Sequence, residues 1–234
     1  KIDVIRRNSI KRNHTSAHLL QAALREVLGE HVHQAGSLVE PDRLRYDFTH
    51  FSAMTEAQIK ETEQIVNNVI LDGIAVENYE TDIENTKGFT ALFGEKYGKR
   101  VRVCKVSDFS MELCGGTHID NTAKIGLFKI ISEGSVSSGV RRIEAVTGLG
   151  VLKLINDYKQ SIINTASVLK LNNIYDIEKK CQSILDENKK IKSELAHLNE
   201  KMASNKIREL IDKAQTINNI KVITSHFKDY DAEQ

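Results

Sequence analysis

Cysteine is scarce in this 234-residue chain, and tryptophan is absent. Three cysteines are too few for a disulfide scaffold and are typical of a protein from a reducing compartment, so we expect a cytoplasmic protein. The sequence also lacks a long apolar run and a recognisable signal peptide. We therefore predict no membrane-spanning segment and no membrane partner.

Neither sign of charge dominates the chain. With 33 Lys and Arg against 32 Asp and Glu, the formal net charge is +1, so any nucleic-acid site has to be a local patch and not a global field. The length and the 40% hydrophobic content predict a globular protein of one or two domains. Because the chain begins at Lys1 instead of Met and ends in a charged stretch, we interpret it as a fragment of a longer protein.

Apolar periodicity and turn signals predict mixed helices and strands. The expected helices span 8–28 and 55–71, and the expected strands span 31–39, 43–51, 74–80, 101–107, 126–132 and 140–146. Thr55 and Gln58 have the spacing of a capping box, and the only proline, Pro41, lies in the turn between the first two strands. Since helices and strands mostly do not alternate as βαβ units, the pattern predicts an α+β domain of antiparallel strands.

The pattern changes after Gly150. From there to about residue 213 the sequence has no proline or glycine, and apolar residues from Ile177 to Met202 recur in steps of four and three. This is a heptad seam, with Asn188 at a core position, and a weaker seam precedes it. The two seams predict a long antiparallel helical hairpin, with a dimeric coiled coil as the alternative. A strand is expected at 220–227.

Two short residue pairs have the spacing of metal ligands. His14 and His18 lie four apart on the first predicted helix, so both face the same side. Cys114 and His118 flank two glycines, which permit a tight turn around a centre. Three imidazole nitrogens and one thiolate suit Zn²⁺. Four protein ligands are typical of a closed structural site, so the spacing leaves structural and catalytic zinc both open.

Two further polar groups have open interpretations. His31 and His33 alternate along a predicted strand and share a face, which either lines the site or is merely solvated. The small-residue loop 134–139 precedes Arg141 and Arg142, and such a loop can present backbone N–H groups and guanidinium charge to phosphate or carboxylate. A flexible hairpin loop is the alternative.

Five motifs, in this order, resemble the editing domain of alanyl-tRNA synthetases. They are Arg12–Leu20, Gln34–Val39, Asp47–Phe51, Glu112–His118 and the loop from Ser132 to Ala145. The paired zinc pattern also occurs in threonyl-tRNA synthetases and free-standing trans-editing proteins. The Cys-Gly-Gly-Thr-His sequence, the double arginine and the long helical tail favour the alanyl family. Many relatives carry threonine directly before the second His, where this chain has Ala17.

The resemblance implies an aminoacyl-tRNA ester hydrolase that edits tRNA(Ala) mischarged with serine or glycine. It implies Zn²⁺ held by His14, His18, Cys114 and His118, and contact with the acceptor end of tRNA(Ala) through Gly139, Arg141 and Arg142. Thr15 and Gln34 are the candidate catalytic residues that read the serine hydroxyl. No aminoacylation motif is visible, so we expect neither ATP use nor alanine activation from this chain.

The resemblance also implies a division into three parts. These are a zinc-dependent editing domain at 1–148, a helical arm at 149–213 and the start of a further domain at 214–234. The full-length family member could self-associate through its C-terminal region. Two alternative functions remain: editing in a threonyl-type or free-standing protein, and a nucleic-acid-binding module with purely structural zinc.

Overall fold

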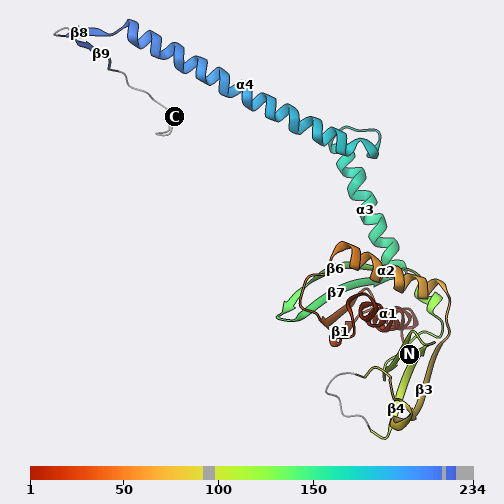
Figure 1. Ribbon diagram of the computed structural model, residues 1–234. Coiled ribbons are helices and arrows are strands. Elements are labelled where there is room, and N and C mark those ends of the chain that lie inside the picture. Colours follow the sequence, from red (N-terminus) through yellow and green to blue (C-terminus); the bar gives the residue numbers. More distant parts are fainter. Residues whose placement is uncertain (92–97, 218–219, 225–234) are drawn as a thin grey trace. The chain divides into compact units, whose positions relative to one another are not determined.

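The computed structural model describes residues 1–91, 98–217 and 220–224, and the chain falls into two compact units that meet between Lys159 and Gln160 (Figure 1). The mixed α+β class predicted from the sequence is confirmed: antiparallel sheets and helices make up the first unit, and a long helix dominates the second. Among the described residues, no helix is long and apolar enough to cross a membrane.

Two helices and two antiparallel sheets form the described part of residues 1–148. The helices are α1 (Val4–Leu28) and α2 (Glu56–Leu71). The larger sheet has the order β1-β2-β7-β6, and its strands are β1 (Gln34–Val39), β2 (Leu44–Thr49), β6 (Phe128–Ser137) and β7 (Val140–Thr147). The smaller sheet has the order β3-β4-β5, with β3 (Val76–Asp82), β4 (Arg100–Val106) and β5 (Ser110–Leu113). Short 3₁₀ turns lie at Ile83–Asn85 and Thr122–Ile125.

Capping side chains set the helix boundaries. Helix α1 starts four residues earlier than predicted because the Asp3 carboxylate accepts a hydrogen bond from the Arg6 backbone N–H. Its end at Leu28 agrees with the prediction, and Gly29 follows at φ 114°, a conformation that favours glycine. The predicted capping box at the start of α2 is confirmed, with Thr55 and Gln58 bonded reciprocally.

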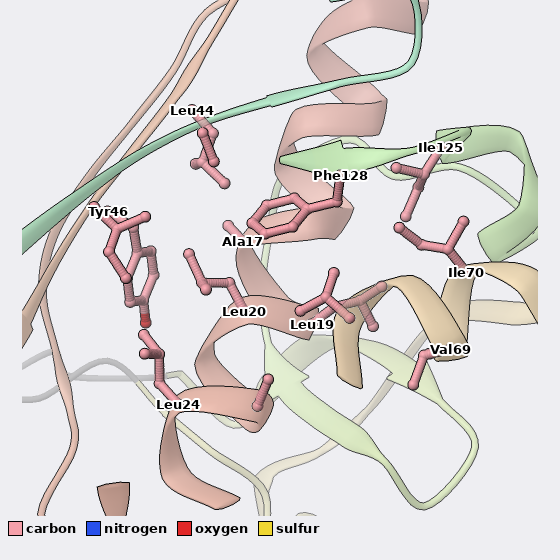
Figure 2. Close-up of a cluster of buried hydrophobic side chains, with 14 of the residues drawn as sticks. Ala17, Leu19, Leu20, Leu24, Leu44, Tyr46, Val69, Ile70, Ile125 and Phe128 are labelled. Carbon is pink, nitrogen blue, oxygen red and sulfur yellow. The ribbon is translucent and has the colours of Figure 1, made fainter. Parts of the chain in front are cut away.

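The core of the first unit forms around α1. Figure 2 shows side chains of α1 gathered with side chains of the large sheet and of α2: Ala17, Leu19, Leu20 and Leu24 with Leu44, Tyr46, Val69, Ile70 and Phe128. Leu19, Leu20 and Leu24 are fully buried, and each such side chain contributes about 1.5–3 kcal/mol to folding. The packing fixes the rotation of α1, so the other residues of this helix also have fixed directions.

Strand β5 was not predicted from the sequence. Its four residues pair with β4 in the register Val103↔Leu113 to Val106↔Ser110. Directly after the strand, the Cys114 backbone N–H donates to the Arg102 carbonyl at 2.9 Å. Four residues are too few to show an alternation of apolar and polar side chains, so the strand forms only because it pairs with β4. This pairing nevertheless determines where Cys114 lies.

The predicted helical hairpin is not what the structure shows. The helices are α3 (Leu149–Val168) and α4 (Ile177–Asp212), joined through a 3₁₀ turn at Ile174–Asp176. No residue of α4 is buried, and its seam residues Ile184, Ile191, Leu195, Leu198 and Met202 are 41–70% exposed. A packed antiparallel pair would bury this seam. A heptad pattern fixes which face of a helix is apolar and leaves open what covers it, which is why the hairpin prediction was wrong.

The chain beyond α4 forms a short antiparallel ribbon of β8 (Gln215–Ile217) and β9 (Ile220–Val222). The strand predicted for 220–227 therefore exists as three residues, and 225–227 lie outside the described part of the chain.

An ion pair joins the two central strands of the large sheet. Asp47 of β2 lies opposite Arg142 of β7, and each carboxylate oxygen accepts a guanidinium hydrogen bond at 2.7 Å. These hydrogen bonds lower the pKa of Asp47, because they favour the ionised carboxylate. The pair therefore stabilises the sheet only while Asp47 is charged.

We predict that Asp47→Asn lowers the free energy of unfolding by about 1–3 kcal/mol at neutral pH, since one partner of a charged, two-point interaction is lost. The folded pKa of Asp47 lies below its unfolded value, so the stabilisation is complete above about pH 4 and is lost as the pH falls through the lowered folded pKa. Urea unfolding at several pH values measures this difference. Glu61→Gln, on the exposed surface of α2, is the matched control. Equal stability of Asp47→Asn and wild type at neutral pH would contradict the assignment.

Candidate functional site

The two predicted ligand pairs meet in space. His14 and His18 project from α1, while Cys114 and His118 come from the loop after β5, and the ligand atoms of all four lie within 4.8 Å of one another. The Cys114 Sγ atom is 3.4 Å from His14 Nε2 and 3.3 Å from His118 Nε2. Among the described residues this is the group of His, Cys, Asp and Glu side chains arranged to hold a metal ion.

The glycine pair lets the loop approach α1. A Cβ atom at Gly116 would lie 1.9 Å from His14 Cε1, far inside van der Waals contact, so any other residue there would force the His14 ring out of its present position. Arg102 Nη1 donates to the carbonyls of Gly115 at 3.1 Å and Gly116 at 2.9 Å, which holds the turn in place. The Gly116 N–H also points to Cys114 Sγ at 3.5 Å. The turn predicted from the sequence thus has a steric cause in His14.

Two buried polar side chains lie behind the histidines. Glu112 forms an ion pair with Nδ1 of His18, and the Thr15 hydroxyl lies 3.2 Å from Nδ1 of His118. Partners at Nδ1 leave Nε2 of each ring directed at the cluster, as in many metal sites. Nε2 of His18 is buried and has no hydrogen-bond partner among the described residues. Such an orphaned nitrogen is costly unless something else binds it.

The electrostatics of the cluster favour the thiolate form of Cys114, which is the form that binds a metal ion. Burial acts to raise the pKa of Cys114, but its interactions with His118, His14 and His18 outweigh it and lower the pKa to about 3. Burial lowers the pKa of His118 to about 4, which keeps that imidazole neutral. For His18, burial lowers the pKa, but the charge of Glu112 outweighs it and raises the pKa to about 10. A metal ion would displace the His18 proton.

These observations fit a zinc ion. One thiolate and three imidazoles within a few ångströms of one another are a suitable donor set for tetrahedral zinc. Nε2 of His18, which lacks a hydrogen-bond partner, would then be satisfied by a bond to the metal. The turn at Gly115 and Gly116, together with Glu112 and Thr15 at the two Nδ1 atoms, holds the donor side chains in place.

A cavity of about 510 Å³ opens beside the cluster. Its walls include the ligands His14, His18 and Cys114 together with Arg25, His33, Gln34, Ser37, Thr90 and Glu112. Gln34 is thus placed in the pocket, as the resemblance implied, at a point where a β-bulge shifts the register of β1. His33 also lines the cavity. Thr15, by contrast, is fully buried behind His118 and is not part of the wall.

Several pocket residues were missed by sequence reasoning. Arg25 lies seven residues after His18 on α1 and hence on the same helix face, a signal that could have identified it. Its Nη1 is 3.5 Å from the Thr90 hydroxyl, and its Nε has no hydrogen-bond partner in the part of the chain that the structure describes. Ser37 and Glu112 carry no comparable sequence signal, because β-strand register decides where they point.

The residues expected to bind tRNA lie on the β6–β7 hairpin, away from the pocket wall. Gly139 forms the turn at φ 73°. Arg141 donates to Glu133 at 2.7 Å and Arg142 to Asp47 at the same distance, so a carboxylate balances each guanidinium. The hairpin thus offers little unpaired positive charge.

Comparisons with known proteins find similar sequences. Residues 101–144 match the family described as "Threonyl and Alanyl tRNA synthetase second additional domain". The alanine–tRNA ligase of Acetivibrio thermocellus is 51% identical over 234 residues, which is 99% of this chain and 26% of that protein. The enzymes of Desulforamulus reducens and Alkaliphilus oremlandii are each 46% identical, over 96% and 95% of this chain and 26% of their own length. The chain therefore spans about a quarter of the curated relatives that it matches.

We predict one zinc ion per chain in the purified protein. His18→Ala and Cys114→Ala should each lose most of the bound metal, because three remaining donors bind zinc far more weakly than four. His33→Ala, which changes a pocket histidine outside the cluster, should keep it. Elemental analysis with circular dichroism of the same samples measures metal and fold together. Full zinc occupancy in folded His18→Ala and Cys114→Ala proteins would exclude this ligand set.

Proposed function

Because this chain is homologous along nearly its whole length to a quarter-length segment of alanine–tRNA ligases, we propose that it hydrolyses the ester bond of tRNA(Ala) mischarged with serine or glycine. The observation that carries the proposal is a cavity whose wall combines three of the four candidate zinc ligands with Gln34. In this proposal the protein acts in the cytoplasm as the editing part of an alanine–tRNA ligase. Aminoacylation and ATP use would belong to the rest of the ligase.

The chemistry of the proposal is ester hydrolysis by water at the 3′ end of the tRNA. Zinc held by His14, His18, Cys114 and His118 would either activate that water or position the amino group of the substrate. Thr15 takes a role different from the one expected: with its hydroxyl at Nδ1 of His118, it orients a ligand instead of touching the substrate.

Gln34 is the proposed reader of the serine side chain. A synthetic pocket built for alanine rejects an added hydroxyl only about 10²-fold, whereas a site that hydrogen-bonds a hydroxyl can reject its absence by about 10⁴-fold. The amide of Gln34 both donates and accepts, and Ser37 adds a second polar group on the same wall. Alanine would leave these groups unpaired and would therefore be spared.

We predict that the zinc-loaded chain deacylates Ser-tRNA(Ala) much faster than Ala-tRNA(Ala). Gln34→Leu should slow Ser-tRNA(Ala) hydrolysis about tenfold or more, or raise Ala-tRNA(Ala) hydrolysis, because the hydrogen bond to the substrate is lost. Gln64→Leu, on the exposed side of α2, is the control. Release of labelled amino acid measures both rates.

Two outcomes would contradict parts of this proposal. No hydrolysis of Ser-tRNA(Ala) with zinc bound would favour the alternative of a nucleic-acid-binding module with purely structural zinc. If Gln34→Leu changes both hydrolysis rates by less than about twofold, Gln34 does not recognise the serine side chain. Editing of a threonyl-type substrate is less favoured, because the relatives that match nearly the whole chain are alanine–tRNA ligases.

For the rest of the chain, we propose an arm at 149–213 and the start of a further domain at 214–234, after an editing domain at 1–148. The exposed apolar seam of α4 supports self-association through this C-terminal region, since such a seam is stable in water mainly when another helix covers it.

We predict that the chain dimerises with rising concentration in sedimentation experiments. The double variant Ile191→Asp/Leu198→Asp should shift it to monomer, because charge at seam positions cannot be buried. Lys192→Asp, beside the seam, should not. A wild-type chain that stays monomeric at its highest soluble concentration would contradict self-association through this seam.

A further inference from the structure

Three aromatic rings with similar orientations lie close together where β2 ends. The rings of His31 and His50 have centroids 5.2 Å apart at an interplanar angle of 27°, and those of His31 and Phe51 are 6.4 Å apart at 16°. Nε2 of His31 also lies 2.9 Å from Nδ1 of His50, a hydrogen bond that joins the two rings edge to edge. Phe51 is 90% exposed, so one large flat face of this group of rings is open to solvent.

The group of rings is anchored to the core. The ring of the fully buried Phe48 lies 6.4 Å from that of His50 at an angle of 23°. The His50 backbone N–H donates to the Gly139 carbonyl at 3.0 Å, and the Thr49 hydroxyl donates to the His31 carbonyl at 2.7 Å. Thr49 and His50 are therefore tied to neighbouring segments, and Phe51 follows His50 directly in the bend after β2.

The group of rings also lies between two regions already described. On one side, Thr49 exchanges hydrogen bonds with His33, which lines the pocket beside Gln34. On the other side, a Cβ atom at Gly139 would be only 3.7 Å from Phe51 Cε1, so the β6–β7 turn passes close to the ring. The aromatic face thus continues from the pocket wall to the hairpin.

We propose that Phe51, His31 and His50 form a stacking platform for the unpaired nucleotides at the 3′ end of a tRNA, leading the terminal residue into the pocket. The inference rests on the proposed function, which requires a 3′ end in that pocket. Single-stranded RNA bases have flat faces that stack on aromatic side chains, and Phe and His are among the residues that serve.

Charge on this surface argues for stacking over phosphate binding. Arg141 and Glu133 both face His50, but they pair with each other, and Arg142 pairs with Asp47. The hairpin next to the platform is therefore nearly neutral. An exposed group of rings without surplus positive charge suits the face of a base better than the backbone of a duplex.

The absence of tryptophan makes a direct test possible. In Phe51→Trp, the introduced indole is the only tryptophan, and stacking of a base on it should quench its fluorescence. The probes are tRNA(Ala) with its intact 3′ end and the same tRNA shortened by its unpaired 3′ nucleotides. We expect quenching by the intact tRNA and little by the shortened one. Tyr175→Trp, at an 86% exposed aromatic of the second unit, is the matched control and should respond equally to both.

A second variant measures the contribution of the ring. Phe51→Ala should weaken binding of intact tRNA(Ala) about 5- to 100-fold, with zinc content unchanged, whereas Phe51→Tyr should retain binding. Equal quenching of Phe51→Trp by both tRNAs, or no quenching, would overturn the platform. Hydrolysis of Ser-tRNA(Ala) without such quenching would contradict the platform and leave the proposed reaction intact. Quenching without hydrolysis would support the platform and contradict the proposed reaction.

Discussion

The site depends on the packing of α1 into the core of the first unit. Leu19, Leu20 and Leu24 are fully buried in the core that α1 forms with the large sheet and α2, which fixes the rotation of the helix. Because positions four residues apart share a face, this packing also aims His14 and His18 in one direction. A site built on such an element is more precise than one built on loops, since helix rotation cannot change without exposing the core.

Around that helix, the remaining contacts complete the cluster. The turn at Gly116 comes as close to His14 as a backbone without Cβ allows, while Glu112 and Thr15 occupy the far nitrogens of His18 and His118. Buried charges of this kind are costly alone and favourable together, because the thiolate, the carboxylate and the imidazolium of His18 compensate one another. The donors are thus already together, an arrangement that would lower the reorganisation needed to bind a metal ion.

Local patterns predicted the parts of this structure that local physics determines. The ligand spacing in His14–His18 and the cap at Thr55 depend on neighbours along the chain, and both were correct in geometry. Strand β5 and the place of Glu112 depend on pairing with β4, which no periodicity reveals in four residues. Thr15 was expected to read the serine hydroxyl because it is the threonine of the first ligand motif, but adjacent helix residues point about 100° apart, and Thr15 faces inward. The seam of α4 showed an apolar face without showing its partner.

The central claim is that one thiolate and three imidazoles, preset by α1 and the glycine turn, hold a single zinc ion. X-ray absorption spectroscopy at the zinc edge of the loaded protein tests it most directly. The account predicts a first shell of one sulfur at about 2.3 Å and three nitrogens at about 2.0–2.1 Å. A shell without sulfur, or with two or more sulfurs, would contradict it.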